Sequence, residues 1–215
     1  MLWAIMPPTS SPAARRPLKS RGAAPITGLA SALASRRVTP NAISLASVAF
    51  AALGAAALLA GPEADRAARI ALLAGAAICV QLRLLCNVID GLVAVEGGLG
   101  GPDGEIFNDA PDRAADALLL VAAGYAGGAP ELGWAAALLA VMTAYVRLLG
   151  GTLGLPQDFS GVMSKPRRMA LLTLACLLAI ADLRVLAVAA GLVAAGSALT
   201  CAGRLQRIRR RVHAR

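Results

Sequence analysis

Aromatic residues make up only 3% of the 215 residues, and charged residues only 15%. A soluble domain of this length would carry about a quarter charged residues. Hydrophobic residues instead reach 58%, which indicates an integral membrane protein. With so few aromatic side chains, packing must depend on Ala, Gly and Leu, and small residues let transmembrane helices approach closely.

Histidine and paired cysteines are also scarce. The only histidine, His213, lies in the basic C-terminal segment, which argues against His-dependent catalytic triads and His-ligated metals. The four cysteines show no CxxC spacing and fall within or beside apolar runs. We therefore interpret them as small buried apolar residues, not as disulfides or zinc ligands.

Positive charge is abundant and concentrated near the two ends, and the net charge is +9. Nucleic-acid binding is one interpretation of such a basic chain, but the sequence has no nucleic-acid motif and no aromatic stacking platform. The interpretation we favour is that these residues are cytoplasmic flanks that follow the positive-inside rule and touch anionic lipid. The basic residues near the two ends of the chain are Arg15, Arg16, Lys19, Arg21, Arg36, Arg37, Arg204, Arg207, Arg209, Arg210, Arg211 and Arg215.

The N-terminal region predicts two different segments. Residues 1–24 are rich in Pro, Ser and Arg and are expected to form a disordered basic arm without a signal peptide. In the segment that follows, Ile26, Leu29 and Leu33 share one helical face. This pattern predicts an interfacial helix along the cytoplasmic leaflet, and the alternative is a flexible linker.

Six apolar runs then predict an all-α polytopic membrane protein with six transmembrane helices. Thr39 can cap the first helix and Pro40 suits its first turn. The second run is longer than a bilayer requires, so its end should project into the cytoplasm. The expected spans are 41–60, 68–95, 105–127, 131–149, 168–181 and 184–203.

Six spans place both termini on the same side of the membrane. The two basic ends and the loop that carries Lys165, Arg167 and Arg168 then all face the cytoplasm. We expect a membrane domain at 25–203, followed by a basic cytoplasmic tail at 204–215. No internal repeat is evident in the sequence, which weakens a transporter interpretation.

Two groups of polar side chains interrupt the apolar pattern. Asn87 and Asp90 are spaced i, i+3, whereas Asn108, Asp112 and Asp116 are spaced i, i+4, i+8. If both segments are helical, each group forms a stripe of oxygen-bearing side chains along its helix. Two such stripes that face each other would make a site for a hard divalent cation. The alternative is a hydrogen-bonded polar patch or a proton relay.

The spacing of these residues resembles the signature of the CDP-alcohol phosphatidyltransferase family, D-x2-D-G-x2-A-R-x8-G-x3-D-x3-D. Every gap in that signature is matched here. The matching positions are Asn87, Asp90, Gly91, Ala94, Val95, Gly104, Asn108 and Asp112. The stretch from Thr39 to Leu45 is also similar to the entry of that family into its first span, so the resemblance covers roughly residues 25–203.

The resemblance implies a chemistry and a set of roles. Family members transfer a phosphatidyl or related phospho-alcohol group from a CDP-linked donor to an alcohol. It implies that Mg²⁺ or Mn²⁺ bridges the donor diphosphate to metal ligands here at Asn87, Asp90, Asn108, Asp112 and Asp116. Asp112, the last aspartate of the signature, would be the catalytic base, and the donor-binding positions would be Asn41, Arg83, Gly91, Ala94 and Gly104.

Three positions depart from the family signature. Asn87 and Asn108 replace aspartates, and Val95 replaces an arginine. An asparagine oxygen can still ligate Mg²⁺, but it adds no negative charge to a site that normally binds two dications. The sequence leaves open whether one ion binds, whether Asp109, Asp116 or Glu105 restores the charge, or whether catalysis is lost. Asp116 is the substitute we favour, because it lies one turn beyond Asp112.

Basic residues suggest a second part of the site. Arg147, Lys165 and Arg168 could bind the phosphate of an acceptor, as basic residues in this region do in family members with phosphorylated acceptors. The alternative for each is a simple cytoplasmic flanking charge. Arg83, one turn before Asn87, could pair with the carboxylates or touch the donor phosphates.

The sequence therefore predicts a membrane transferase of phospholipid synthesis. Its donor would be CDP-diacylglycerol, its acceptor a small, phosphorylated alcohol, and its soluble product CMP. The family leads us to expect a homodimer in the inner (plasma) membrane, with the site on the cytoplasmic side. The alternative is a catalytically inactive lipid- or nucleotide-binding membrane protein on the same scaffold.

Overall fold

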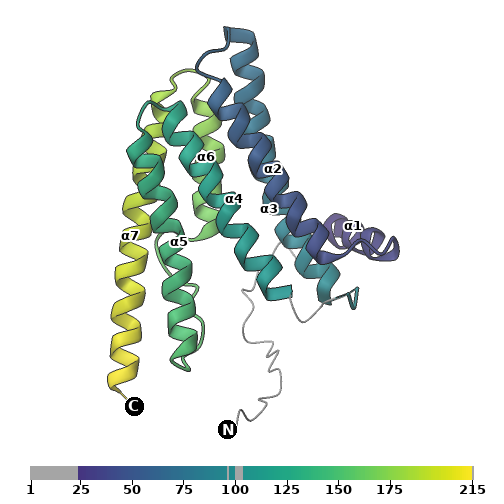
Figure 1. Cartoon of the computed structure of the whole chain (residues 1–215), viewed down its shortest axis with the longest axis vertical. Coiled ribbons are helices and arrows are strands. Elements are labelled where there is room, and N and C mark those ends of the chain that lie inside the picture. Colours follow the sequence, from purple (N-terminus) through teal and green to yellow (C-terminus); the bar gives the residue numbers. More distant parts are fainter. Residues whose placement is uncertain (1–23, 96, 100–103, 215) are drawn as a thin grey trace, which may run out of the picture.

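The computed structural model describes residues 24–95, 97–99 and 104–214, with the backbone alone at 105 and 108. In these ranges the protein is a bundle of long helices joined by short connections (Figure 1). The predicted disordered arm at 1–24 falls almost wholly outside the described residues. The helices are α1 (Ala24–Ser35), α2 (Pro40–Ala60), α3 (Arg66–Val95), α4 (Gly104–Ala126), α5 (Pro130–Thr152), α6 (Lys165–Leu178) and α7 (Arg184–His213).

The local signals at the start of the first long helix act as expected. The Thr39 side chain accepts a hydrogen bond from the Ala42 amide at 3.3 Å, and Pro40 occupies the first turn of α2. A capping hydroxyl satisfies an amide that has no partner inside the helix, and proline has no amide to leave unpaired. These two residues set the point at which the bundle begins.

All six predicted apolar segments form helices, but they differ as membrane spans. By length and composition α2, α3, α5 and α7 could each cross a membrane. Helix α4 carries Asp109, Asp112, Arg113 and Asp116 in its first half, and α6 has only 14 residues. The all-helical architecture is therefore found, and the count of six spans stays a prediction.

Close contacts between small residues hold the bundle together. A Cβ atom added to Gly124 of α4 would lie 2.6 Å from the Cα atom of Gly133 in α5, and one added to Gly127 would lie 2.4 Å from the Ala187 amide of α7. A Cβ atom added to Gly54 of α2 would lie 3.0 Å from the Cβ atom of Cys79 in α3 and 3.1 Å from Cδ2 of Leu119 in α4. The expected packing through small residues is confirmed, because bulkier side chains could not fit at these crossings.

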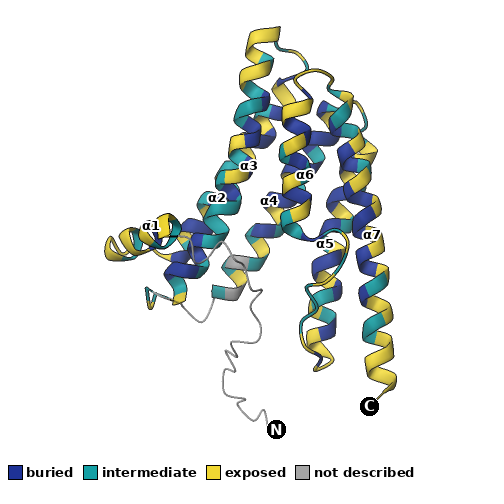
Figure 2. Cartoon of the chain, turned by 180° about the vertical axis from the view of Figure 1, so that it is seen from behind, coloured by how far each residue is buried: buried dark blue, intermediate teal, exposed yellow. Residues whose placement is uncertain are grey.

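Figure 2 shows exposed residues along the outward faces of the helices, and many of them are large apolar side chains. Soluble proteins rarely expose large apolar surfaces, whereas a lipid environment favours them. The exposed side chains on α2, α5 and α7 include Leu45, Leu53, Leu59, Trp134, Leu138, Val188, Leu192 and Leu199.

Helix α1 crosses the bundle at the end where α3 terminates (Figure 1). Its Ala30 is buried against Ile89, Leu92 and Val93 of α3, and Ile26 and Leu33 pack at the edge of this cluster, whereas Leu29 is exposed. The predicted helix is therefore present and docked on α3, and its position at a membrane interface remains a prediction.

Helix α7 continues to His213, through the segment expected to be a separate basic tail. The connection from 153 to 164 lies against it. The Met163 amide donates a hydrogen bond to the Thr200 hydroxyl at 2.9 Å, and Gly161, with φ of 137°, places its Cα beside Thr200. A bulkier residue would fit neither the backbone conformation nor the contact.

Candidate functional site

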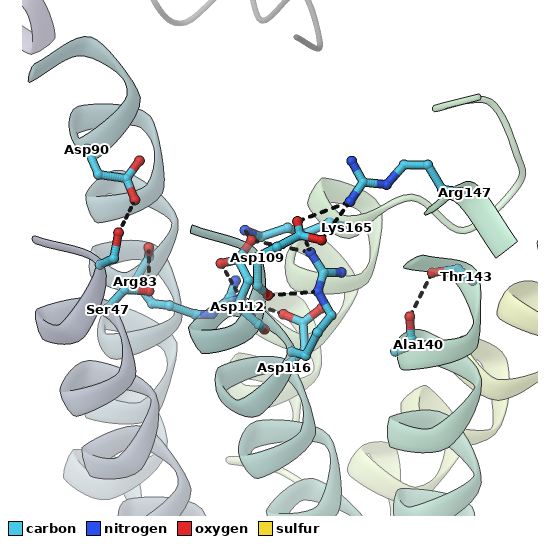
Figure 3. A network of polar contacts seen from close by, with 12 residues as sticks. Ser47, Arg83, Asp90, Asp109, Asp112, Asp116, Ala140, Thr143, Arg147 and Lys165 are labelled. Atoms are coloured by element: carbon cyan, nitrogen blue, oxygen red, sulfur yellow. Dashed lines mark hydrogen bonds and ion pairs between the residues drawn. The ribbon is translucent and has the colours of Figure 1, made fainter. Parts of the chain in front are cut away.

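A polar cluster lies where the C-terminal half of α3 meets the N-terminal half of α4, the end of α5 and the start of α6 (Figure 3). The signature positions fall on α3 and α4 at this cluster. Pro111 stands inside α4 immediately before Asp112. Proline cannot donate the backbone bond of that turn, so the helix has a weak point next to the site.

Asp90 occupies the α3 side of the cluster, apart from the carboxylates of α4 (Figure 3). It is 3% exposed, and its Oδ2 atom accepts a hydrogen bond from the Ser44 hydroxyl of α2 at 2.7 Å. In the described part of the chain its Oδ1 atom has no hydrogen-bond partner, and neither has the buried Nδ2 atom of Asn87. Buried polar atoms usually find partners, so this place is prepared for a ligand.

Asp112 and Asp116 lie one turn apart on α4 and are both buried. Nη2 of Arg83 lies 2.6 Å from Oδ1 of Asp116 and 3.4 Å from Oδ1 of Asp112. It also donates to the Asp112 carbonyl at 3.2 Å. Of the two roles that the sequence left open for Arg83, the structure displays the pairing with carboxylates. Its guanidinium is fully buried, because α3 crosses α4 at this level.

Helix α6 supplies two more cations. Arg168 is buried and donates through Nη2 to Oδ2 of Asp116 at 2.8 Å. Its Nη1 atom lies within hydrogen-bonding distance of the Thr143 hydroxyl and the Met163 carbonyl. All these contacts are internal to the protein, and the acceptor-binding role expected for Arg168 stays a prediction. Lys165 is 21% exposed and its ammonium group contacts Oδ2 of Asp112.

Arg147 closes the cluster from α5. Its Nη2 atom lies 3.0 Å from both carboxylate oxygens of Asp109, and its Nη1 atom donates to Gln157 at 2.9 Å. The guanidinium also lies 5.2 Å from the centre of the Phe159 ring. One guanidinium nitrogen is therefore shared between both carboxylate oxygens, and the other fixes the orientation of the group through Gln157. Asp109 is also held by Arg113, at 3.3 Å.

The remaining predicted donor-binding residues lie on the same two sides of the cluster. Gly91 and Ala94 are half-buried on α3, and Asn41 is half-buried in the first turn of α2. Gly104 begins α4, and a Cβ atom added there would meet no described atom within 4 Å. The side chain of Asn108 lies outside the described ones.

Sequence reasoning missed the residues that fix the loop from 153 to 164. Arg204 of α7 is buried and donates to the Ser160 carbonyl at 2.9 Å and to the Thr143 carbonyl at 2.6 Å. Arg207 donates to Oδ2 of Asp158 at 2.7 Å. Ser197, Thr200, Arg204 and Arg207 share one face of α7, and this polar stripe was a readable signal.

Asp158 is held strongly in this loop. Partial burial raises its pKa, but hydrogen bonds from Ser160 and Arg207 outweigh burial and lower the pKa to about 2. Hydrogen bonds to the ionised form stabilise that form. The Asp158 carboxylate therefore anchors the loop to α7 at neutral pH. Its neighbours in the loop, Gln157 and Phe159, contact Arg147.

Comparison with solved structures identifies this architecture. A structure of Mycobacterium tuberculosis phosphatidylinositol phosphate synthase with CDP-DAG bound matches with a TM-score of 0.70 and 20% identity, over 86% of this chain and 94% of that one. The chain shares the fold of that synthase.

Two further structures of this synthase agree. The complex with manganese and citrate matches with a TM-score of 0.70 and 20% identity, over 85% of this chain and 88% of that one. The apo form matches with a TM-score of 0.65 and 19% identity, over 83% and 93%. No protein-family model and no curated protein matches the chain by sequence. The synthase is a CDP-alcohol phosphatidyltransferase, the family whose signature the sequence resembles.

Among the described side chains, the oxygen atoms without a cation partner lie on the α3 side of the cluster. Oδ1 of Asp90 is buried without a partner, and Asn87 lies one turn away. Asp112 and Asp116 instead face Arg83, Lys165 and Arg168. Among the described residues, no three His, Cys, Asp or Glu side chains form a metal-holding group. Asp116 lies against the guanidinium groups of Arg83 and Arg168, and its predicted role as a metal ligand stays a prediction.

Proposed function

We propose that this protein is a multi-pass membrane enzyme that transfers a phosphatidyl group from CDP-diacylglycerol to a small, phosphorylated alcohol and releases CMP. The observation that carries the proposal is the position of the signature. Its eight residues fall with unbroken spacing on α3 and α4, at the polar end of a fold shared with phosphatidylinositol phosphate synthase. A shared fold alone is weak support for an activity, and the match of the signature positions at the polar cluster adds support from the site itself.

Two apolar grooves beside α3 support a lipid donor with two acyl chains. One, of about 590 Å³, lies between α3 and α6, and the other, of about 330 Å³, lies between α1, α2 and α3. Leu82 and Leu85 line both grooves, so the grooves meet along α3 one to two turns before Asp90. A diacylglycerol with one chain in each groove would hold its phosphates at the polar cluster.

The proposed reaction is a substitution at the phosphorus that bears the diacylglycerol. The acceptor hydroxyl oxygen forms a bond to this phosphorus, the bond to the bridging oxygen of the diphosphate breaks, and CMP leaves with that electron pair. The hydroxyl proton passes to Asp112, whose carboxylate lies at the boundary between the buried cations and the open site. A divalent cation, Mg²⁺ or Mn²⁺, held by Asp90, Asn87 and Asn108 would neutralise charge on the donor phosphates.

The acceptor phosphate would be bound by Arg147 and Lys165. Both are partly exposed, and they approach the cluster from α5 and α6. Arg168 would act indirectly, by holding Asp116 beneath them. Gly91, Ala94, Gly104 and Asn41 would border the donor nucleotide. The small residues would allow close approach of the nucleotide to the helix backbone.

The orientation follows from charge. We place both basic ends of the chain and the polar cluster on the cytoplasmic side of the inner (plasma) membrane. There a water-soluble acceptor can meet a lipid donor. The homodimer expected from the family is part of the proposal, together with contacts between the basic flanks and anionic lipid.

The proposal is tested with the full chain in phospholipid nanodiscs. CDP-diacylglycerol, Mg²⁺ or Mn²⁺ and a panel of free and phosphorylated alcohols are supplied, and lipid products are identified by mass spectrometry. We expect one phosphorylated alcohol to yield a new phospholipid, and Asp112→Asn to yield none. Products in equal amount from Asp112→Asn would contradict the role of Asp112, and no product from any acceptor would contradict the transferase.

A second function has support of its own. Asp112 is engaged by Arg83 and Lys165, and two signature aspartates are asparagines, as in a scaffold that binds lipid or nucleotide without catalysis. Binding of CDP-diacylglycerol without any transfer product would favour this alternative. Replacing Asn87 and Asn108 by Asp would then be expected to create activity, whereas in an active enzyme the same change would lower activity or alter metal preference.

A further inference from the structure

Both carboxylates on the α4 side of the site are already occupied by cations of the protein. Asp112 has Arg83 at one oxygen and Lys165 at the other, and Asp116 has Arg83 at one oxygen and Arg168 at the other. These three cations come from α3 and α6. Their side chains meet at the carboxylates of Asp112 and Asp116 on α4.

The charge of the whole cluster opposes a second dication. Among the described side chains it contains one more positive than negative group, because five cations face four carboxylates. A divalent ion at Asp112 would lie within a few ångströms of Lys165 and Arg83, and repulsion between close charges is strong where water is excluded. The carboxylates are Asp90, Asp109, Asp112 and Asp116, and the cations are Arg83, Arg113, Arg147, Lys165 and Arg168.

The α3 side of the cluster has the opposite character. Oδ2 of Asp90 accepts a hydrogen bond from the Ser44 hydroxyl, and Oδ1 is buried and without a partner among the described residues. A single carboxylate with the neutral amide of Asn87 nearby suits one divalent ion, whose remaining ligands would be phosphate oxygens and water.

Burial separates the roles of the three cations. The side chains of Arg83 and Arg168 are almost wholly inaccessible, whereas that of Lys165 is 21% exposed. Arg83 and Arg168 can therefore neutralise Asp116 but cannot reach a ligand. Lys165 alone of the three joins the buried pair to the open side of the site.

We propose that the Lys165 ammonium takes the place of a second divalent cation at Asp112, so that this site binds one metal ion, at Asp90, and uses a fixed side-chain charge for the other. The inference rests on the proposed function, since the metal ion would face the phosphates of the CDP-linked donor, and Lys165 would face both those phosphates and the acceptor phosphate. It also explains why Asn87 and Asn108 are tolerated, because a site with one dication needs less negative charge.

The test counts bound Mn²⁺. The full chain in nanodiscs is titrated with Mn²⁺ in the presence of excess CDP, and free Mn²⁺ is followed by electron paramagnetic resonance. We expect one Mn²⁺ per wild-type chain. Lys165→Met is expected to bind two, because Oδ2 of Asp112 becomes available. Lys165→Arg should keep one, and so should Arg210→Met, which removes an exposed charge near the end of α7.

A wild-type count of two, or of none, would overturn the inference even if a variant failed to fold. A count of one Mn²⁺ per chain in Lys165→Met, the same as in wild type, would also overturn the inference. The measurement needs no turnover, so its outcome is separate from that of the transferase assay. One bound Mn²⁺ without transfer would uphold the inference and reject the enzyme, whereas two bound Mn²⁺ with transfer would do the reverse.

Discussion

Asp116 is the residue on which the buried charges of the site depend. Nη2 of Arg83 lies 2.6 Å from one oxygen of Asp116, Arg168 donates to the other oxygen at 2.8 Å, and both guanidinium groups are shielded from water. Breaking such a pair leaves a buried charge without compensation, and the cost exceeds the net contribution of the intact pair. The network is therefore better understood as positioning α3, α4 and α6 than as a source of stability in itself.

Asp116→Asn should consequently destabilise the protein strongly. The change keeps the shape and removes the charge, so we expect the free energy of unfolding to fall by about 3–5 kcal/mol, measured by denaturation in mixed micelles. Asp109→Asn is the matched control. The Asp109 side chain is 37% exposed, and exposed pairs contribute about 1 kcal/mol or less. Equal stability of Asp116→Asn and wild type would contradict the conclusion that Asp116 compensates the buried charges of Arg83 and Arg168.

Asp158 predicts a pH dependence. Its pKa in the folded state, about 2, is below the ordinary value of 3.8, so the carboxylate stabilises the folded state above the ordinary pKa. This contribution is lost as pH falls through the folded-state value. The stability difference between wild type and Asp158→Asn should be constant above about pH 5 and vanish near pH 2. A difference that does not change with pH would show that the Arg207 contact carries no charge effect.

Sequence reasoning singled out the charged residues of the cluster, and it offered the pairing of Arg83 with the carboxylates as one alternative, but it did not identify the other pairs. Spacing placed Asp112 and Asp116 on one stripe, because helix geometry fixes which residues of one helix share a face. It could not reveal that Arg168, 52 positions beyond Asp116, would neutralise that carboxylate. Pairing between helices depends on crossing points, and those depend on packing over the whole bundle.

At the scale of the elements, the contact between α4 and α5 limits what the sequence can tolerate. A Cβ atom on Gly124 would lie 2.6 Å from the Cα atom and 2.7 Å from the nitrogen of Gly133. Backbone atoms cannot move aside as a flexible side chain would. The two helices must therefore separate if either glycine is replaced.

Gly124→Ala should lower the free energy of unfolding by about 1–3 kcal/mol, the usual cost of overpacking a well-packed core. Gly75→Ala in α3 is the matched control, since no described atom lies within 4 Å of a Cβ placed there. Because alanine favours helix more than glycine, the control should be neutral or stabilised by up to about 1 kcal/mol. Both variants are measured by the same denaturation. Equal effects of the two would contradict the tight contact.

The helices themselves were predictable, since long apolar runs, the Thr39 cap and the glycine-rich connections are local signals. The continuation of α7 was not. The segment after 203 is strongly basic, and composition suggested a separate tail. In the structure Arg204 and Arg207 of this segment bind the loop from 153 to 164. A polar stripe on one helical face can therefore mean docking against a loop as well as contact with lipid or solvent.

At the scale of the whole molecule, the bundle combines an apolar exterior with a polar end. In the described part of the chain, four helices are long and apolar enough to cross a membrane. Asp109, Asp112 and Asp116 of α4 are paired there with cations of the protein. This arrangement places a cluster of carboxylates and cations beside two apolar grooves. A lipid with a phosphate-bearing head group is the class of ligand that fits both features.

The measurement that tests this account most directly is CMP release from CDP-diacylglycerol by the full chain in nanodiscs. CMP release is measured with the acceptor identified in the panel, once with Mn²⁺ and once with a chelator. The proteins compared are wild type, Asp112→Asn and Arg210→Met. The account predicts release by wild type and Arg210→Met with Mn²⁺, and a loss of at least about 10²-fold in Asp112→Asn. Release that survives both chelator and Asp112→Asn, or no release under any condition, would contradict it.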